Sequence, residues 1–331
     1  MSSSQIKTQI REFYDFLRQL LDKTKIDAVC AENFHFSLPP GFSLALNMAC
    51  FEKRVPIVLR LHSYASSEIQ QELLKILFWD RLVCVSKSGA GDCFSKGIPV
   101  KQLVTKYLGV NTREFNPGLD RTWLKRELRL PVRAKVVLHA SRIIIGTKEI
   151  LAAKGITILL DAFSKISATS PDYRLVMAIG KAPSWLKSEF QGAWERLQGF
   201  IKLHNIENRV TCHTFELAAM PLVYAGADAF VLASQNESFG QVYIEAMASG
   251  TPVIGTNTGG VPEIITDNVN GFLISPDNAS LLAQKIELLL SNDDLRHQFI
   301  ASGLETVRQK FTASRQISRL LHFLGEVKEK P

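Results

Sequence analysis

The feature that most constrains the fold is a repeated alternation of short apolar runs with longer amphipathic patterns. Eight runs have the composition of buried strands, and many are separated by stretches whose apolar residues recur every three or four positions. Strands that alternate with helices in this way form parallel sheets covered by helices on both faces. The pattern therefore predicts an α/β fold built of two doubly wound units. The expected strands are residues 26–30, 55–61, 82–85, 136–140, 174–178, 229–233, 252–255 and 271–274, and the clearest helices are 6–21, 156–166, 241–248 and 279–290.

Two domains are expected from the length of the chain and from a cluster of helix breakers. The 331 residues suffice for two separate cores, and Asn116, Pro117 and Gly118 interrupt the pattern between two α/β series. We place the boundary there, which gives domains 1–117 and 118–331, with the option that the last helix packs back on the first domain. Ligands of open parallel sheets bind beyond the carboxyl ends of the strands, so two such domains facing each other would form a binding cleft.

Composition excludes several classes of protein. Charged residues make up 21% and hydrophobic residues 46% of the chain, which is ordinary for a globular protein and unlike a disordered one. The five cysteines form neither a C-x-x-C pair nor a zinc-ligand spacing, so no metal centre is expected. The first residues lack the apolar core of a secretory signal, and we therefore expect a cytoplasmic protein.

The net charge of +7 is unevenly spread. Between residues 121 and 135 the chain carries six Lys and Arg side chains and a single Glu. A solvated surface would explain this segment, and so would contact with acidic lipid headgroups or a phosphorylated substrate. Peripheral contact at the inner face of a membrane therefore stays open. Nucleic acid is not an expected partner, because neither interleaved aromatic residues nor a recognition motif accompany the charge.

The densest chemistry follows the expected strand 229–233, where a turn leads into the expected helix 241–248. Gly240 in that turn has no side chain, so a ligand can approach the backbone closely, and the first amides of the helix lack intrahelical partners. Such a helix start attracts phosphate. Glu237 and Glu245 border the same turn, and carboxylates there would accept hydrogen bonds from sugar hydroxyls. Taken alone, the two glutamates could equally be solvated surface residues.

The residues around these glutamates resemble family 4 of the retaining glycosyltransferases. The resemblance implies a GT-B fold, with two Rossmann-like domains facing each other across a cleft, and it covers most of residues 136–290. The residues that carry it are Glu237 and Glu245 with Phe239-Gly240 between them, Ala246-Met-Ala-Ser-Gly250-Thr-Pro252-Val253, Gly259-Gly260-Val-Pro262-Glu263, Asn270-Gly271-Phe-Leu-Ile-Ser-Pro, Ser141-Arg142 and Lys154-Gly155-Ile-Thr-Ile-Leu-Leu-Asp-Ala-Phe.

The resemblance implies roles for the residues of this turn. Glu245 is expected to bind the nucleotide ribose and Glu237 the transferring sugar. The backbone amides of Phe239 and Gly240 are expected near that sugar and the phosphates. The donor-binding set is completed by Ser238 and Gln241.

The resemblance also implies cations that hold the diphosphate. Arg142 and Lys154 take this role, although residues 143–153 separate them by more than is usual in the family and supply a second lysine, Lys148. We prefer Lys154, because the matching helix pattern follows it immediately, and keep Lys148 as the alternative. His62, which follows a strand, is placed near the donor hexose, and His35 is a weaker candidate on the acceptor side.

The first domain resembles the family less than the second. The strand expected at 26–30 matches a middle strand of the family, so the opening strand and glycine-rich turn are missing and the domain is expected to be short. The edge left open would be covered by residues 6–21, by a partner chain, or by sequence lost from the gene.

The expected function is retaining transfer of a sugar from a nucleotide diphosphate sugar to a hydroxyl of a glycan, a glycolipid or a small molecule, with neither metal nor other cofactor. The acceptor is expected to be a saccharide or lipid-linked molecule. A nucleotide-sugar epimerase shares the fold and is the first alternative. A noncatalytic nucleotide-sugar-binding subunit is the second.

Overall fold

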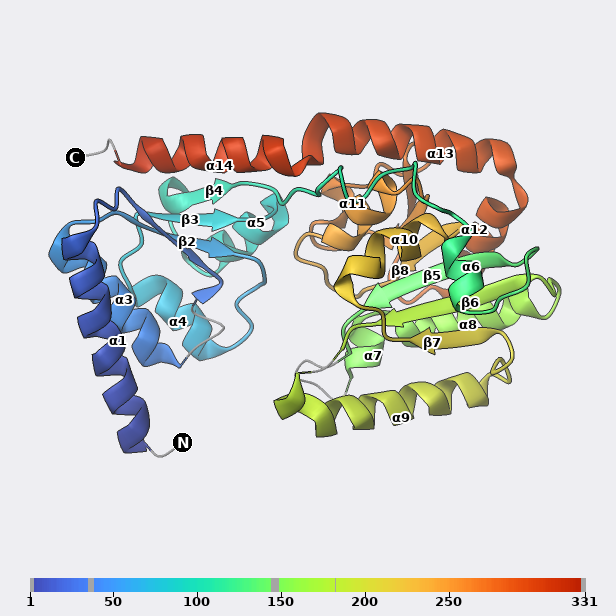
Figure 1. Ribbon diagram of the computed structural model, residues 1–331, viewed down its shortest axis with the longest axis horizontal. Helices are drawn as coiled ribbons and strands as arrows, with labels where there is room; N and C mark the ends of the chain where they lie inside the picture. The colour runs from blue at the N-terminus through green and yellow to red at the C-terminus, as the bar shows by residue number, and fades with distance from the viewer. Residues whose placement is uncertain (1–2, 35–38, 144–148, 182, 329–331) are drawn as a thin grey trace. The chain divides into compact units, whose positions relative to one another are not determined.

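The computed structural model describes residues 3–34, 39–143, 149–181 and 183–328 (Figure 1). The chain divides into two compact units. Unit 1 consists of Met1–Leu108 and Ser314–Pro331, and unit 2 consists of Gly109–Ala313. The first boundary therefore lies earlier in the chain than the expected one at 117/118, and the last helix, α14 (Ala313–Lys328), belongs almost entirely to unit 1.

Unit 2 is built on a parallel six-stranded sheet. Its strand order is β10-β9-β8-β5-β6-β7, which is the doubly wound order 3-2-1-4-5-6 read from the opposite edge. The order reverses between the central neighbours β5 and β8, where the chain first winds toward one edge of the sheet and then toward the other. The strands are β5 (Lys135–Ser141), β6 (Tyr173–Ile179), β7 (Val210–His213), β8 (Ala229–Leu232), β9 (Val253–Thr256) and β10 (Gly271–Ile274).

Helices cover both faces of the unit 2 sheet because adjacent strand residues point to opposite sides. Val231 of β8 joins the core formed with α8 (Ile156–Ser167), α9 (Lys187–Leu203) and α12 (Ala279–Ser291). Its neighbour Phe230 contacts Tyr224 of α10 (Met220–Ala225) and Tyr243 of α11 (Gln241–Ala248) on the other side. The other helices of this unit are α6 (Trp123–Glu127), α7 (Ile150–Ala153) and α13 (Asp293–Thr306), with short helical turns at Ser184–Leu186, Leu217–Ala219, Val261–Glu263 and Val307–Phe311.

Unit 1 has a parallel four-stranded sheet in the order β1-β2-β3-β4. Figure 1 shows α1, α3 and α4 on one side of this sheet and α14 on the other. Phe323 and Val327 of α14 pack on Val58 and Val83 of the sheet. The elements are β1 (Val29–Glu32), β2 (Ile57–Leu61), β3 (Arg81–Cys84), β4 (Leu103–Thr105), α1 (Ser3–Lys23), α3 (Pro40–Lys53), α4 (Glu68–Ile76), α5 (Lys87–Ser95) and a turn at Val100–Gln102.

The sequence pattern located most of these elements. The helix expected at 241–248 has those bounds, and the helices expected at 6–21, 156–166 and 279–290 are present with small extensions. The strand expected at 26–30 was placed too early, because β1 begins at Val29 and ends at Glu32. The short strands β4 and β7 were missed. Among the helices of the described ranges, none combines the length and apolar character needed to cross a membrane.

Candidate functional site

The predicted donor residues of unit 2 lie at the point where the strand order reverses. Arg142 directly follows β5, and the turn at residues 233–240 directly follows β8. Because β5 and β8 are neighbours and parallel, both segments leave the sheet at the same edge, the carboxyl ends of the strands. Doubly wound sheets bind ligands at this edge and at this reversal. The topology thus supports a site that the motifs alone had indicated.

The turn that precedes α11 depends on glycine. Gly240 has a φ of +98°, and a β-carbon there would lie 2.6 Å from Cδ2 of Tyr243. Tyr243 cannot move aside, because it is fully buried and its hydroxyl donates to the Leu232 carbonyl at 2.6 Å. Glycine therefore leaves the start of α11 without a side chain above it, and a helix start of this kind is suited to bind an anion.

Phe239 contributes backbone rather than side chain to this turn. Its ring is 1% exposed and packs edge-on against Phe311, with ring centroids 5.8 Å apart. The buried ring fixes the turn to the core. The Phe239 side chain is therefore not available to a ligand, and the role that the resemblance implied for this residue likewise concerns its backbone alone.

Lys154 and Glu237 meet in the structure although 83 positions separate them in the chain. The Lys154 ammonium Nζ lies 3.5 Å from Oε2 of Glu237, and both side chains are largely buried, with 31% and 16% exposed. The Gln235 amide donates to the Ala153 carbonyl at 3.0 Å and joins the two segments. A cation and a carboxylate are thereby held together at the carboxyl edge of the sheet.

Gly155 makes this approach of the two segments feasible. It has a φ of +66° at the start of α8, and a β-carbon there would lie 1.9 Å from the Ala233 carbonyl oxygen. No L residue with a side chain fits such a position without moving the backbone. The two residues therefore depend on each other: Gly155 lets the two segments approach, and Lys154 then reaches Glu237.

Glu245 lies one helical turn beyond Gly240 and is half-buried. The hydroxyl of Tyr224, a buried residue of α10, donates to Oε2 of Glu245 at 3.0 Å. Burial raises the pKa of Glu245, and hydrogen bonds from Tyr224 and Gln241 oppose that rise. The hydrogen bond from Tyr224 thus helps to hold the Glu245 side chain in place.

Two further residues, Arg142 and the buried His139, lie at the carboxyl end of β5. A β-carbon on Gly180 would lie 2.6 Å from Cγ of Arg142, so the arginine stem passes over that glycine. His139 is fully buried, with its ring nitrogens 3.2 Å from the Val231 carbonyl and 2.8 Å from the Ser141 hydroxyl. Burial and, less strongly, the nearby Lys154 charge lower the pKa of His139 to about 4, so this ring is neutral at physiological pH.

Of the residues expected in the donor site, the structure brings Lys154 and Glu237 into contact and places Arg142 directly after β5, the strand beside β8. Ser238 is half-buried and Gln241 exposed, at the turn and the helix start. Lys148, the alternative cation, lies outside the described residues. In the described part of the chain no three His, Cys, Asp or Glu side chains are placed to hold a metal ion together.

His62 belongs to unit 1 and follows β2. Its Nε2 lies 2.5 Å from Oε2 of Glu32, and its amide donates to Oδ1 of Asn33 at 3.0 Å. Partial burial opposes ionisation of Glu32, but hydrogen bonds and charges from His62 and Arg60 lower the pKa of this carboxyl overall. Sequence reasoning missed Glu32. The alternative His35 lies outside the described residues.

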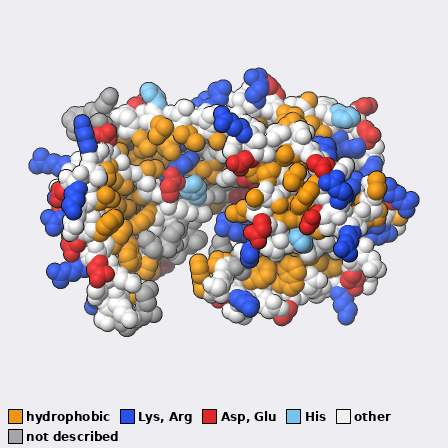
Figure 2. Space-filling model, viewed as in Figure 1, with side chains coloured by type: hydrophobic (Ala, Val, Ile, Leu, Met, Phe, Trp, Pro, Cys, Tyr) orange, Lys and Arg blue, Asp and Glu red, His pale blue; other side chains and the backbone are white. Residues whose placement is uncertain are grey.

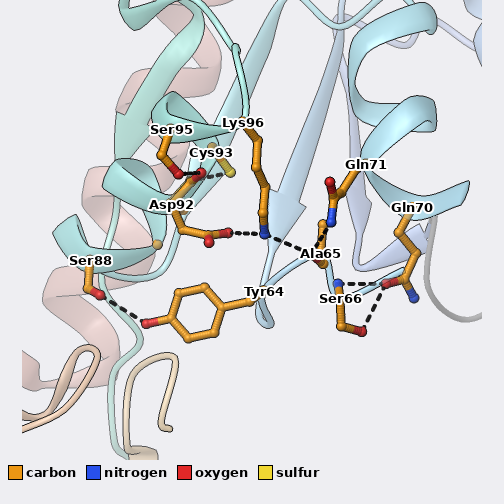
Figure 3. A network of polar contacts seen from close by, with 12 residues as sticks. Tyr64, Ala65, Ser66, Gln70, Gln71, Ser88, Asp92, Cys93, Ser95 and Lys96 are labelled. Carbon is orange, nitrogen blue, oxygen red and sulfur yellow. Dashed lines mark hydrogen bonds and ion pairs between the residues drawn. The ribbon is translucent and has the colours of Figure 1, made fainter. Parts of the chain in front are cut away.

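The loop that carries His62 is attached to α4 and α5 by polar contacts (Figure 3). The Tyr64 hydroxyl lies 2.9 Å from the Ser88 hydroxyl, and Lys96 donates to the Ala65 carbonyl at 2.7 Å. Oε1 of Gln70 accepts from the Ser66 amide at 3.0 Å, beside the capping box that Ser67 and Gln70 form at the start of α4. These contacts fix the loop, and with it the position of His62 at the carboxyl end of β2.

Comparison with known families identifies the chain. The model of the family "Glycosyl transferases group 1" matches residues 132–306, which are more than half of the chain and include all six strands of the unit 2 sheet. This chain belongs to the glycosyl transferases group 1. The resemblance seen in the motifs is thereby confirmed at the level of the family.

Two curated members of the family show how far the similarity extends. The N-acetyl-alpha-D-glucosaminyl L-malate synthase of Bacillus anthracis is 27% identical over 297 residues, which are 86% of this chain and 71% of that protein. The D-inositol 3-phosphate glycosyltransferase of Corynebacterium kroppenstedtii is 30% identical over 220 residues, 66% of this chain and 47% of that protein. The chain thus spans less than half of the second relative.

Solved structures confirm the GT-B fold. A glycosyltransferase from Rickettsia africae superimposes with a TM-score of 0.81 at 22% identity, over 100% of this chain and 84% of that one. Anabaena Alr3699/HepE, solved in complex with UDP and glucose, gives a TM-score of 0.79 at 22% identity, over 95% and 80% of the two chains. At such identity the likeness concerns the fold alone.

Proposed function

We propose that this glycosyltransferase moves a hexose from a nucleotide diphosphate sugar to an acceptor hydroxyl with retention of anomeric configuration and without a metal ion. The observation that carries the proposal is the contact of Lys154 with Glu237 at the strand-order reversal of unit 2, where Arg142 directly follows β5. In this proposal Glu245 holds the ribose and Glu237 the sugar. His62 of unit 1 acts near the hexose.

The chemistry of the leaving group explains why cations and a helix start belong at this edge. As the glycosidic bond breaks, the departing diphosphate gains negative charge. Fixed cations and free amides that face it stabilise the transition state more than the ground state. Arg142, Lys154 and the first amides of α11 would supply both, so the charge of the leaving group needs no metal ion to balance it.

Retention follows if the donor and acceptor react on one face of the sugar. The leaving diphosphate, held by Arg142 and Lys154, would accept the proton of the acceptor hydroxyl on the same face that it leaves. No protein nucleophile is then required. The acceptor would be a glycan, a glycolipid or a small molecule. The names of the relatives, which include a glucosaminyl L-malate synthase and an inositol phosphate glycosyltransferase, agree with a small or conjugated acceptor.

The test begins with the donor, since a ligand that binds only the folded protein raises its unfolding temperature. A thermal-shift panel of UDP-, GDP- and ADP-sugars identifies the donor, and proton NMR then gives the anomeric configuration of the transferred sugar. We expect release of nucleotide only when acceptor is present, an unchanged anomer, and full activity with chelator. Nucleotide release without acceptor would instead indicate an epimerase, and an inverted anomer would contradict retention.

Variants of the two cations test the mechanism itself. Arg142→Ala and Lys154→Ala should each lower kcat by about a hundredfold, the usual loss when a group that stabilises developing charge is removed. Lys165→Ala, which removes an exposed lysine of α8 that pairs with Asp161, is the matched control and should retain activity. Full activity of Lys154→Ala would show that Lys148 or another cation holds the diphosphate.

A further inference from the structure

Unit 2 contains a cavity at the edge of its sheet opposite the donor residues. The cavity has a volume of about 390 Å³ and lies between α6 with the segment that follows it and the turn at residues 226–228. That turn leads into β8, which begins at Ala229, and the segment after α6 leads into β5, which begins at Lys135. The cavity therefore adjoins the amino ends of the two strands whose carboxyl ends carry the donor residues.

The wall of the cavity is strongly basic. Four of its side chains are cationic, Arg121, Lys125, Arg126 and Arg129, against the single carboxylate of Asp228. In Figure 2 Lys and Arg side chains gather on the surface around α6. Net positive charge in a concave site attracts anions from solution and holds them against competition from water.

Most of these cations keep their charge uncompensated. Arg121 donates to the Gly250 carbonyl at 3.2 Å and Lys125 to the Val132 carbonyl at 3.2 Å. A bond to a neutral carbonyl fixes the position of a cation but leaves its positive charge in place. Among the residues that the structure describes, the only acidic partner of these four cations is Asp120, which pairs with Arg126 at 2.7 Å.

The carboxylate in the cavity wall is already occupied by the sheet. Oδ2 of Asp228 accepts from the Val136 amide at 2.8 Å. This bond uses Asp228 to fasten the beginning of β5 to the beginning of β8. The cations that line the cavity are thus not paired with the one acid that lines it.

Arg129 occupies a backbone position that favours glycine. It has a φ of +52°, and the next amide, that of Leu130, donates back to the Lys125 carbonyl at 2.8 Å. This is the arrangement that ends helices, and glycine is the residue usually found at its left-handed position. An arginine there accepts backbone strain while it adds a fourth cation to the cavity.

We propose that this cavity binds a phosphate group, carried either by a phospholipid headgroup or by a soluble phosphorylated molecule. Guanidinium groups match the geometry of phosphate oxygens with paired hydrogen bonds, and three of the four cations are arginines. The volume suits a headgroup or a small phosphate ester. Val132, whose side chain is 92% exposed, adds an apolar rim.

The experiment uses the full chain and two probes, one for each source of phosphate. Pyrophosphate binding is measured by calorimetry in an Arg142→Ala background, so that the donor site contributes little. Cosedimentation compares vesicles of phosphatidylglycerol with vesicles of phosphatidylcholine at physiological salt. Arg129→Gly and Lys125→Gln remove a cavity cation each, and the glycine suits the left-handed backbone, so neither should unfold the protein.

We expect both variants to weaken binding of at least one probe by about tenfold, because each removes a charge-assisted hydrogen bond. Arg133→Gln is the control, since Arg133 lies at the same edge but pairs with Asp172 outside the cavity; it should change affinity by less than about twofold, as exposed ion pairs do. Loss of vesicle binding identifies a headgroup, and loss of pyrophosphate binding alone identifies a soluble ligand. The proposal fails if the parent chain binds neither probe, or if Arg133→Gln is as harmful as Arg129→Gly.

The proposed function of the donor site does not depend on this proposal. Nucleotide affinity depends on residues at the carboxyl edge, so Arg129→Gly should bind the donor nucleotide like the parent chain. A parallel loss of nucleotide affinity in Arg129→Gly would show that the cavity variants act through the fold of unit 2 and would also overturn the proposal.

Discussion

The two edges of the unit 2 sheet use the left-handed backbone conformation in opposite ways. At the carboxyl edge Gly155 takes this conformation with no room for a side chain, because a β-carbon would lie 1.9 Å from the Ala233 carbonyl oxygen. At the amino edge Arg129 takes it with its side chain exposed to solvent. Gly155 is thus enclosed by the core, whereas the Arg129 side chain lies on the surface. Substitution of the left-handed residue should therefore affect chiefly stability at the carboxyl edge and chiefly binding at the amino edge.

The largest effect is expected from Gly155→Ala. The added methyl group collides with backbone and the φ of +66° is unfavourable for alanine, so unit 2 should lose at least about 3 kcal/mol of stability. Chemical denaturation measures this loss. The matched control is Gly199→Ala in α9, where a β-carbon meets nothing within 4 Å and alanine should be neutral or stabilising by up to about 1 kcal/mol. Equal changes in the free energy of unfolding for Gly155→Ala and Gly199→Ala would contradict the proposed constraint at the carboxyl edge.

The next effect concerns pH and the buried His139 beneath the carboxyl edge. Its pKa falls from the ordinary 6.5 to about 4 on folding, so the unfolded chain binds the extra proton between these values. The stability that depends on a neutral His139 is fully present above pH 6.5 and is lost as the pH falls toward 4, with a total of about 3 kcal/mol. The test measures the unfolding free energy of the parent chain and of His139→Gln across this pH window. The parent chain should lose more stability than the variant as the pH falls. Equal losses in the two proteins would show that the ring titrates normally in the folded protein.

A smaller effect of the opposite sign is expected at the amino edge. Arg129→Gly should leave stability unchanged or raise it by about 0.5 kcal/mol, because relief of the left-handed strain is partly offset by the greater freedom of glycine in the unfolded chain. Thermal unfolding of the variant beside the parent measures this shift. A clear destabilisation would mean that Arg129 supports the fold, and the amino edge would then resemble the carboxyl edge.

The part of the site that could be predicted from sequence is the part made by one continuous segment. The strand, turn and helix around Gly240 are visible in the sequence because glycine and the apolar pattern mark each of them. The sequence pattern did not predict that Lys154 contacts Glu237. The contact becomes possible because β5 and β8 are neighbours in the sheet. Family motifs therefore named the candidate residues, and the topology places their segments at one edge of the sheet.

What sequence could not predict depends on contacts between distant segments or on weak patterns. Strands β4 and β7 lie at the sheet edges and are only half-buried, so they lack the apolar runs that mark central strands. Glu32 became visible as a partner of His62 only when β1 and β2 were paired in register. The basic segment at 121–135 was recognised, but its cavity needs the turn at 226–228, about a hundred residues later.

The measurement that most directly tests the central claim, that unit 2 binds a nucleotide sugar through its carboxyl edge, is calorimetry with two ligands. The free nucleoside diphosphate and the intact donor are titrated into the parent chain, Glu245→Ala and Glu237→Ala, with the exposed Glu287→Ala as the control. Glu245→Ala should weaken both ligands by about tenfold or more, because ribose hydroxyls lose their acceptor. Glu237→Ala should weaken the intact donor to a similar extent and leave the nucleotide nearly unchanged. Unaltered nucleotide affinity in Glu245→Ala, or equal losses of both ligands in Glu237→Ala, would contradict the assignment.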